Sequence, residues 1–145
     1  MEDKRVDKRS IHAAEFLNEP IEYKKSFTRG MRVDLGNYVL IEISGTASVD
    51  ENGETYMPGD FTAQTKRTYD NITALLEAEG ADWHDVVKTR CYLKDMKYYE
   101  EFNKYRNAFY KEQELNPFPA SVGIAAELCR PELLVEIEAT ALIKK

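Results

Sequence analysis

The feature that most constrains this chain is the strict alternation of apolar residues in its last segment, residues 133–143. Six apolar side chains share one face: Leu133, Val135, Ile137, Ala139, Ala141 and Ile143. The other face mixes carboxylates with apolar groups and a threonine: Leu134, Glu136, Glu138, Thr140 and Leu142. A period of two over this length predicts a β-strand whose apolar face packs on a core. The mixed face is typical either of a solvated surface or of a half-buried one that retains a carboxylate for a purpose.

Further strands and helices follow from the same kind of pattern. Alternation predicts strands over residues 21–27, 38–44 and 86–94, and a short strand near 120–126. Helical spacing predicts one helix over residues 60–79, with Asp60 as its N-cap and Gly80 at its end, and a second over 98–113 with core-facing aromatic residues. Ser10 is a candidate N-cap for a short helix over residues 10–18.

The predicted order ββαβαββ defines an α+β fold with a mixed sheet, and two helices can cover only one face of such a sheet. The uncovered face would be too apolar for open water and too polar for a core: it carries Leu40, Glu42, Ser44, Tyr92, Leu134, Glu136, Glu138 and Leu142. A subunit interface that contains a polar cleft satisfies both requirements. We therefore expect a homo-oligomer that binds a small molecule between its subunits.

Length and composition restrict the other possibilities. A chain of 145 residues suits one domain, which we place at residues 21–145 behind an N-terminal extension of residues 1–20. The net charge of −6 argues against a nucleic-acid partner, which normally leaves a basic footprint. No apolar run approaches the ~20 residues of a membrane span, and no signal peptide is apparent, so a cytoplasmic location without a membrane partner is expected. Cys91 and Cys129 lack metal-ligand spacing, and no metal or cofactor is expected.

Several motifs resemble those of the RidA (YjgF) family. They are VDLGNYVLIEISGT at residues 33–46, the block GDFTAQTKRTYDNITALLEAEGADWHDVVKTRCYLKDM at residues 59–96, the pair Phe102–Asn103, and FPAS with LLVEIEATAL near the C-terminus. Together they span roughly residues 33–143 in the family's order. The resemblance implies a chorismate-mutase-like fold and a homotrimer with clefts between its subunits.

The resemblance also implies an activity and a set of site residues. The best-known members hydrolyse reactive enamines and imines to keto acids and ammonia. The family's glutamate, which holds the attacking water or moves a proton, falls on Glu136, and its cleft serine and asparagine fall on Ser44 and Asn103. Its carboxylate-binding arginine and a nearby cysteine fall on Ser121 and Gly123. Because a serine hydroxyl cannot replace the charge and fork geometry of an arginine, the departure at Ser121 is serious.

Two other arginines are candidates to bind a carboxylate. Arg29 follows Phe27 in the segment SFTRG, where the family places aromatic residues near the cleft. Arg130 follows Cys129 in LCRPELL, a segment that also resembles, more weakly, the C-terminal part of chorismatases. Either arginine can serve a ligand or a salt bridge, and the sequence leaves the two roles open.

Three functions remain for these residues. A deaminase needs little beyond a placed water and a proton relay, and a half-buried Glu136 suits the relay because burial raises a carboxyl pKa. A non-catalytic metabolite binder or regulator can use the same clefts. The third, an endoribonuclease or translation inhibitor, fits the acidic charge least well; a chorismatase-like hydrolase is likewise less favoured than the first two functions.

Overall fold

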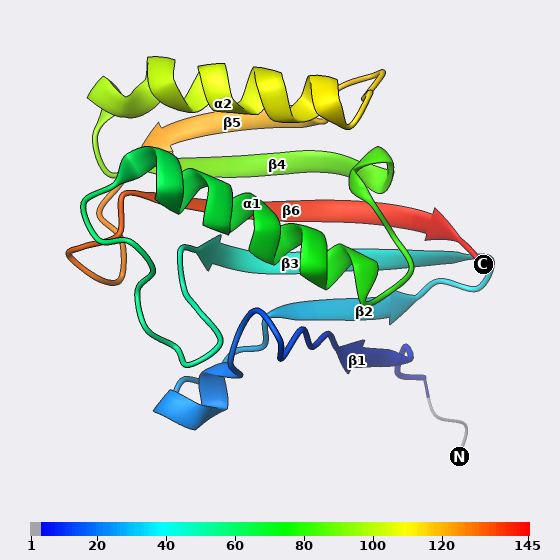
Figure 1. The fold of residues 1–145 in the computed structure, drawn as a ribbon. Coiled ribbons are helices and arrows are strands. Elements are labelled where there is room, and N and C mark those ends of the chain that lie inside the picture. The colour runs from blue at the N-terminus through cyan, green and yellow to red at the C-terminus, as the bar shows by residue number, and fades with distance from the viewer. Residues whose placement is uncertain (1–3) are drawn as a thin grey trace.

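The computed structural model describes residues 4–145, which form a six-stranded mixed sheet with the order β1-β2-β3-β6-β4-β5 (Figure 1). The strands are β1 (Lys8–Ser10), β2 (Gly30–Asp34), β3 (Tyr38–Ala47), β4 (Val86–Leu93), β5 (Ala120–Ala125) and β6 (Val135–Lys144). Neighbouring strands are antiparallel except β4 and β5, which are parallel. Strand β5 is therefore an edge strand, reached through a helical crossover.

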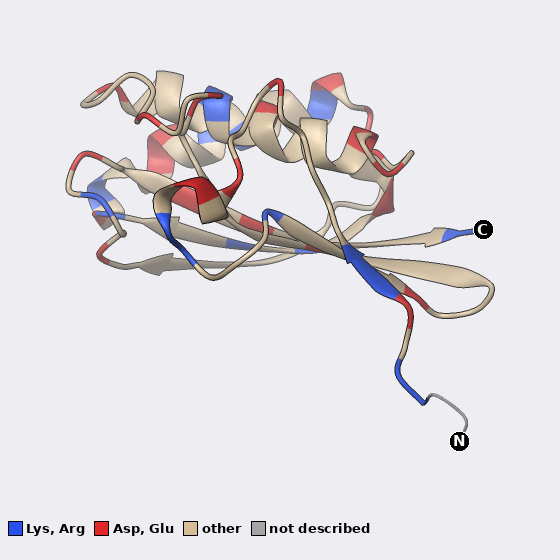
Figure 2. Cartoon of the chain, turned by 90° about the horizontal axis from the view of Figure 1, so that it is seen from below, with Lys and Arg blue, Asp and Glu red and all other residues tan. Residues whose placement is uncertain are grey.

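Two helices, α1 (Phe61–Glu77) and α2 (Tyr99–Glu112), lie on the same side of the sheet. Figure 2 shows this arrangement from below, with the other side of the sheet left uncovered in the single chain. Three short 3-10 helices connect the larger elements: η1 (Pro20–Tyr23), η2 (Trp83–Asp85) and η3 (Met96–Tyr98). The predicted α+β class, with both helices on one face, is confirmed.

Helix α1 begins and ends as its sequence predicts. The Asp60 carboxylate accepts a hydrogen bond from the Ala63 N–H at 3.0 Å, which satisfies one of the donors that a helix start leaves unpaired. Gly80 has a φ of +71°, a left-handed conformation that glycine adopts without a steric penalty. The buried face includes Thr65, Ile72 and Leu75, each with no measurable exposure. This face holds the helix on the sheet.

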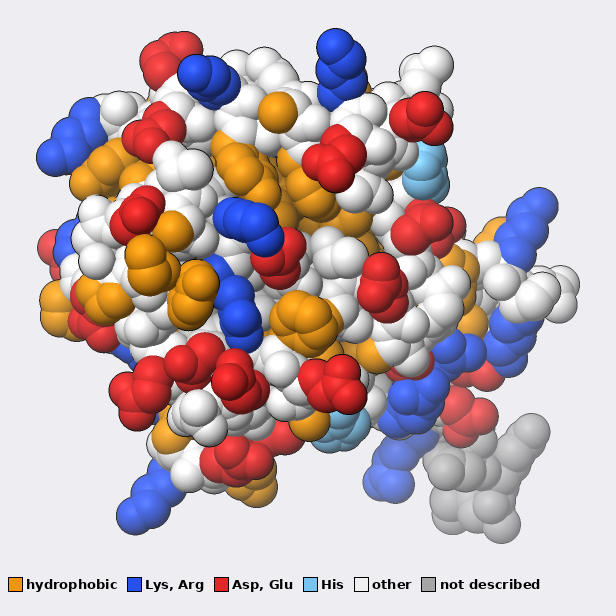
Figure 3. Space-filling model, viewed as in Figure 1, with side chains coloured by type: hydrophobic (Ala, Val, Ile, Leu, Met, Phe, Trp, Pro, Cys, Tyr) orange, Lys and Arg blue, Asp and Glu red, His pale blue; other side chains and the backbone are white. Residues whose placement is uncertain are grey.

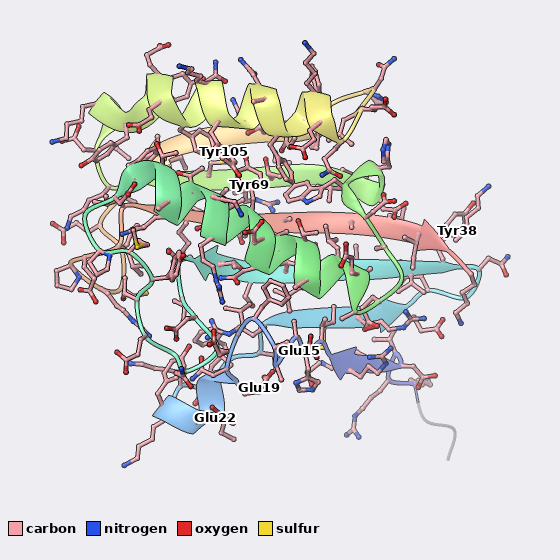
Figure 4. The ribbon with its side chains drawn as sticks, viewed as in Figure 1. Glu15, Glu19, Glu22, Tyr38, Tyr69 and Tyr105 are labelled. Atoms are coloured by element: carbon pink, nitrogen blue, oxygen red, sulfur yellow. The ribbon has the colours of Figure 1, made fainter. Side chains whose placement is uncertain are left out.

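Aromatic packing joins the two helices. Tyr69 projects from α1 and Tyr105 from α2, and their ring centroids are 5.6 Å apart (Figure 4). Tyr69 also packs against Phe109 at 4.7 Å, and Phe102 is 1% exposed. The aromatic residues of α2 therefore belong to the core, as the spacing predicts.

Strand β6 lies between β3 and β4 in the middle of the sheet. Its inward residues Val135, Ile137, Ala139 and Ala141 are at most 2% exposed. The predicted apolar face is confirmed, and it packs under the helices. The alternate residues consequently face the uncovered side.

Three local predictions are wrong. Residues 21–27 do not form a strand: Pro20 starts the 3-10 helix η1, Lys24 follows it with a φ of 61°, and β2 begins only at Gly30. Residues 10–18 do not form a helix: Ser10 is the last residue of β1, which pairs with β2, and the rest of the segment contains only a turn. Alternation along residues 86–94 predicts Val87 on the core face with Thr89, Cys91 and Leu93, but Val87 is 51% exposed, because a register shift in β4 turns Val86 inward in its place.

The N-terminal segment is attached to the sheet and the core. Ile11 and Leu17 are 1% and 0% exposed and belong to the same hydrophobic cluster as β3 and β6. The division at residue 20 stays a prediction, and residues 1–3 lie outside the described part of the chain. None of the helices within residues 4–145 has the length and apolar character needed to cross a membrane.

Candidate functional site

A cavity of about 490 Å³ opens at the end of the sheet where β3 ends and β6 begins. We call it the main cavity. Its lining comes from η1 and the loop after it, from β3, from the loop before β6 and from β6: Tyr23, Lys25, Phe27, Arg29, Ser44, Gly45, Ala47, Val49, Cys129, Arg130, Leu133 and Glu136. Six predicted site residues, Phe27, Arg29, Ser44, Cys129, Arg130 and Glu136, therefore meet in one place.

Glu136 lies at the start of β6, opposite Ala47 of β3 and Tyr92 of β4. Its carboxyl is half-buried, and desolvation raises its pKa, with a smaller contribution from the charge of Glu138. Within residues 4–145 no hydrogen bond or ion pair engages this carboxyl. By contrast, Glu138 accepts a 2.5 Å hydrogen bond from the Tyr92 hydroxyl and lies 4.0 Å from Arg90 Nε. Of the two carboxyls of β6 on this face, Glu136 is thus the one available for chemistry.

An irregularity in β3 places the strand backbone beside Glu136. The pairing of β3 with β6 shifts between Ile43 and Thr46, so Ser44 and Gly45 lie in a bulge. A Cβ atom on Gly45 would lie 2.6 Å from Glu136 Oε2, so the carboxyl rests against a position that only glycine leaves open. Ser44 uses its hydroxyl to donate to the Thr28 carbonyl at 2.5 Å. The bulge therefore lines the cavity, and through Thr28 it fixes the segment that carries Arg29.

Arg29 is 4% exposed, although it lines the main cavity. Its Nε donates to the Asn18 carbonyl at 2.9 Å and its Nη2 to Asn18 Oδ1 at 3.0 Å. Its guanidinium also lies 5.8 Å from the ring centroids of Tyr23 and Phe27. Burial lowers the pKa of Arg29. The N-terminal segment, through Asn18, thus fixes this side chain in place.

Arg130 reaches the same cavity from the loop before β6. Its Nη1 donates to Thr55 Oγ1 at 3.1 Å, and its guanidinium lies 6.0 Å from the Tyr23 ring centroid. Tyr23 is therefore contacted by two arginines, Arg29 and Arg130. The sequence left open which arginine faces the cavity, and in the structure both do.

The other three predicted site residues lie elsewhere: Ser121 and Gly123 line a cavity of about 140 Å³ between β4, β5 and α2, and Asn103 lies beside it on α2. We call it the strand-edge cavity; its lining is Cys91, Leu93, Tyr99, Phe102, Arg106, Ser121 and Gly123. Arg106 donates from Nη1 to Ser121 Oγ at 3.2 Å and from Nη2 to Asn103 Oδ1 at 3.0 Å. Within one chain, Asn103, Ser121 and Gly123 therefore gather around an arginine of α2 and do not line the main cavity.

Sequence reasoning missed three residues of these cavities. Arg106 stands three positions after Asn103, so both fall on one side of α2, and this spacing is a signal that was present in the sequence. Gly45 follows Ser44 directly, but nothing in the sequence shows that a carboxyl lies against it. Tyr23 was missed because residues 21–27 were predicted to form a strand. Within residues 4–145, no group of three or more His, Cys, Asp and Glu side chains is placed to hold a metal ion.

Fold and cavity together define a class: an α+β protein whose sheet carries a half-buried glutamate in an arginine-containing cavity at one end. A family model described as Endoribonuclease L-PSP matches residues 21–143. The chain therefore belongs to this family, which is the RidA/YjgF family, and its sheet and helices have the chorismate-mutase-like fold.

Individual relatives agree with this assignment. The chain is 34% identical over 111 residues to the 2-iminobutanoate/2-iminopropanoate deaminase of Escherichia coli, covering 76% of this chain and 83% of that protein. It is 32% identical over 109 residues to a RutC family protein of Pyrococcus abyssi, covering 75% and 81%. The crystal structure of the YjgF gene product from E. coli superposes with a TM-score of 0.78 at 29% identity, covering 94% of this chain and 99% of that one.

Proposed function

We propose that this protein hydrolyses a small carboxylated enamine or imine to a keto acid and ammonia in the main cavity. The observation that carries the proposal is Glu136, a half-buried carboxyl with a raised pKa and no partner within residues 4–145, which lines the same cavity as Arg29 and Arg130. A carboxyl with a pKa moved toward neutrality can both accept and return a proton. The name of the E. coli deaminase supports the same reaction class.

The reaction needs only water and this proton relay. An enamine first takes a proton from solvent on its β-carbon and becomes an iminium ion. Ionised Glu136 accepts a proton from water as the water oxygen bonds to the iminium carbon, which gives a neutral carbinolamine. Protonated Glu136 then returns that proton to the amine nitrogen. The carbon–nitrogen bond breaks, ammonia leaves with the bonding electron pair, and the hydroxyl proton passes to solvent as the carbonyl forms.

We further propose that the site is completed between the subunits of a homotrimer. Apolar side chains are exposed on the uncovered sheet face and on β5: Tyr38 at 44%, Val122 at 40%, Ile124 at 44% and Leu142 at 41%. In one chain, Ser121 and Asn103 are separated from Glu136, although the family resemblance puts all three in one cleft. A neighbouring copy that brings its strand-edge cavity against the main cavity would reunite them, and the arginine it contributes would be Arg106.

Turnover should be tested with a coupled assay. An amino-acid oxidase supplies imines from a panel of amino acids, and keto-acid formation is followed with and without the protein. We expect Glu136→Gln to lower kcat by about 10²–10⁴-fold, the usual contribution of a general acid–base group. Glu112→Gln, which alters an exposed carboxyl at the end of α2, is the matched control and should be unaffected. Full activity of the Glu136 variant would overturn the proposed mechanism.

A second candidate is a non-catalytic metabolite binder, and the serine at position 121 favours it, because the strand position of the family's arginine carries no charge here. A binder would accelerate none of the imines yet would be stabilised by keto acids in a thermal-shift experiment. An RNA-cleaving function has less support. The chain carries a net charge of −6, and acidic and basic side chains are interspersed on the helix-bearing face (Figure 3).

A further inference from the structure

The guanidinium groups of Arg29 and Arg130 both line the main cavity, and within residues 4–145 neither forms an ion pair. No acidic group within residues 4–145 lies within the 4.0 Å of an ion pair from Arg29 or Arg130. The acidic side chains near these arginines have other partners. Glu19 lies 2.7 Å from His12 Nδ1, and Glu132 accepts a 2.9 Å hydrogen bond from Thr55. Figure 4 shows Glu19 on the N-terminal segment that carries Asn18.

This arrangement costs free energy in the empty protein. Burial, and to a smaller extent the charge of Arg130, lower the pKa of Arg29, and Tyr23 and Glu19 offset part of this shift. Arginine is well suited to forming two parallel hydrogen bonds to a carboxylate. A bound anion would remove the repulsion and supply the missing partners, so the cavity is electrostatically prepared for one.

The two arginines are also held in position before any ligand binds. Neutral groups orient them: Asn18 accepts two hydrogen bonds from Arg29, and Thr55 accepts one from Arg130. The Tyr23 ring lies near both guanidinium groups, at 5.8 Å and 6.0 Å. These contacts fix the direction of the charges without neutralising them. Such preorganisation lowers the cost of binding an anion.

The charge of the lining indicates how many anionic groups the ligand carries. The cationic side chains of the cavity are Lys25, Arg29 and Arg130, and its one acidic side chain is Glu136. For the lining that one chain supplies, a ligand with one carboxylate leaves an excess positive charge, whereas a ligand with two balances it; Arg106 of a neighbouring copy would add a further cation. A volume of about 490 Å³ leaves room for a molecule larger than the smallest keto acids.

We propose that the main cavity binds a dicarboxylate, so that the substrate class is a 2-imino or 2-oxo acid with an acidic side chain. The reaction part of this statement rests on the proposed function, but the binding part does not. Arg130 and Arg29 hold one carboxylate each at the Tyr23 side of the cavity. The reacting carbon then lies on the side of Glu136.

Calorimetric titration tests the binding part with defined probes: 2-oxoglutarate and oxaloacetate as diacids, 2-oxobutanoate and pyruvate as monoacids, and inorganic phosphate. We expect the better diacid to bind at least about tenfold more tightly than either monoacid, because it forms one additional charge-assisted contact. Arg130→Gln should remove most of that preference, and Lys111→Gln, an exposed cation at the end of α2, should leave it intact. The affinities of Arg29→Gln are interpreted only if circular dichroism shows that this variant has a native fold.

Each outcome separates this inference from the proposed function. Equal affinity for diacids and monoacids, or phosphate binding as tight as the diacid, would overturn the dicarboxylate inference. Imine hydrolysis that depends on Glu136 would nevertheless leave the deaminase function standing. Conversely, diacid binding that depends on Arg130, together with no turnover of any imine, would uphold the inference and reject the deaminase.

Discussion

At the scale of single residues, the most informative comparison is between Glu136 and Glu138. They lie two positions apart on one face of β6, and the alternation of the strand does not distinguish them. The structure gives Glu138 a tyrosine hydroxyl and a nearby guanidinium, whereas Glu136 receives neither and rests against Gly45. The two carboxyls differ only in the contacts that other strands make with them, and the sequence of β6 alone does not reveal those contacts.

The first prediction concerns the pH dependence of stability. Because burial raises the pKa of Glu136, the folded protein binds this proton more tightly than the unfolded chain. Below the pKa of about 4.3 in the unfolded chain, the carboxyl is protonated in both states, and its contribution to the free energy of unfolding is fully present. The contribution is lost as the pH rises through the folded pKa. Glu136→Gln, which never ionises, should therefore gain stability relative to the native protein on going from low to neutral pH.

Urea unfolding at about pH 4 and about pH 7.5 measures this difference, on either side of the expected transition. The exposed Glu112→Gln serves as the control, because surface substitutions usually change the free energy of unfolding by less than about 0.5 kcal/mol. A variant-to-native difference that is the same at both pH values would contradict the raised pKa.

The second prediction concerns Gly45. An alanine Cβ there would lie 2.6 Å from Glu136 Oε2, so the carboxyl must move. We expect Gly45→Ala to reduce kcat by at least about tenfold, since a misplaced proton-transfer group loses much of its contribution. Because the loss acts through Glu136, adding Gly45→Ala to Glu136→Gln should cost little more. Fully additive losses in the double variant would show that Gly45 acts by another route.

At the scale of elements, the N-terminal segment contributes to the sheet, to the core and to the main cavity. β1 extends the sheet, Leu17 has no measurable exposure, and Asn18 orients Arg29. The segment thereby links the core to the main cavity. In Figure 4 it lies at the lower edge of the sheet, with Glu22 of η1 at one end and Tyr38 of β3 toward the opposite end of the molecule.

The third prediction follows from this attachment. Leu17→Ala should lower the free energy of unfolding by about 2–5 kcal/mol, the usual cost of a cavity in a packed core. Ile21→Ala, only four positions later but 78% exposed, should change it by less than about 0.5 kcal/mol. Urea denaturation followed by circular dichroism compares the two. Equal small effects would mean that the N-terminal segment is not part of the cooperative unit.

Which elements were predictable depends on where their determinants lie. Helix α1 and strand β6 carry their own signals, a cap, a terminating glycine and a regular period, and the structure confirms both. The segment 21–27 also alternates, but alternation is only one condition for a strand, which must also find a pairing partner. Here Pro20 starts a 3-10 helix and Lys24 adopts a left-handed backbone, so pairing with β3 begins at Gly30.

At the scale of the whole molecule, the predicted site divides into two groups. One group lines the main cavity: Phe27, Arg29, Ser44, Cys129, Arg130 and Glu136. In the other group, Ser121 and Gly123 line the strand-edge cavity with Arg106, which donates a hydrogen bond to Asn103. The sequence could assign these residues to one site only through the family resemblance, since their separation depends on the path of β5 at the edge of the sheet. The division is what an active site shared between copies predicts.

The fourth prediction tests that sharing. If Glu136 comes from one subunit and Arg106 from its neighbour, Glu136→Gln and Arg106→Ala should each inactivate the proposed homotrimer, yet a mixture can contain intact sites. Such a site forms wherever an Arg106 variant supplies its Glu136 to a neighbour that retains Arg106. Random assembly of equal amounts makes about a quarter of the sites intact in a cyclic trimer. Mixing the two variants, with brief denaturation and refolding to exchange subunits, should therefore restore about a quarter of the native activity.

The controls decide how this recovery is interpreted. Each variant refolded alone should stay inactive, and unexchanged mixtures should show no recovery, because intact sites require subunits of both kinds in one trimer. Light scattering on the refolded samples confirms that they assemble. If the mixture stays inactive although mixed trimers form, both residues act within one chain, and the joining of the two cavities between subunits is wrong. If Arg106→Ala alone retains full activity, the strand-edge cavity has no part in the reaction, and the arginines of the main cavity must hold the substrate unaided.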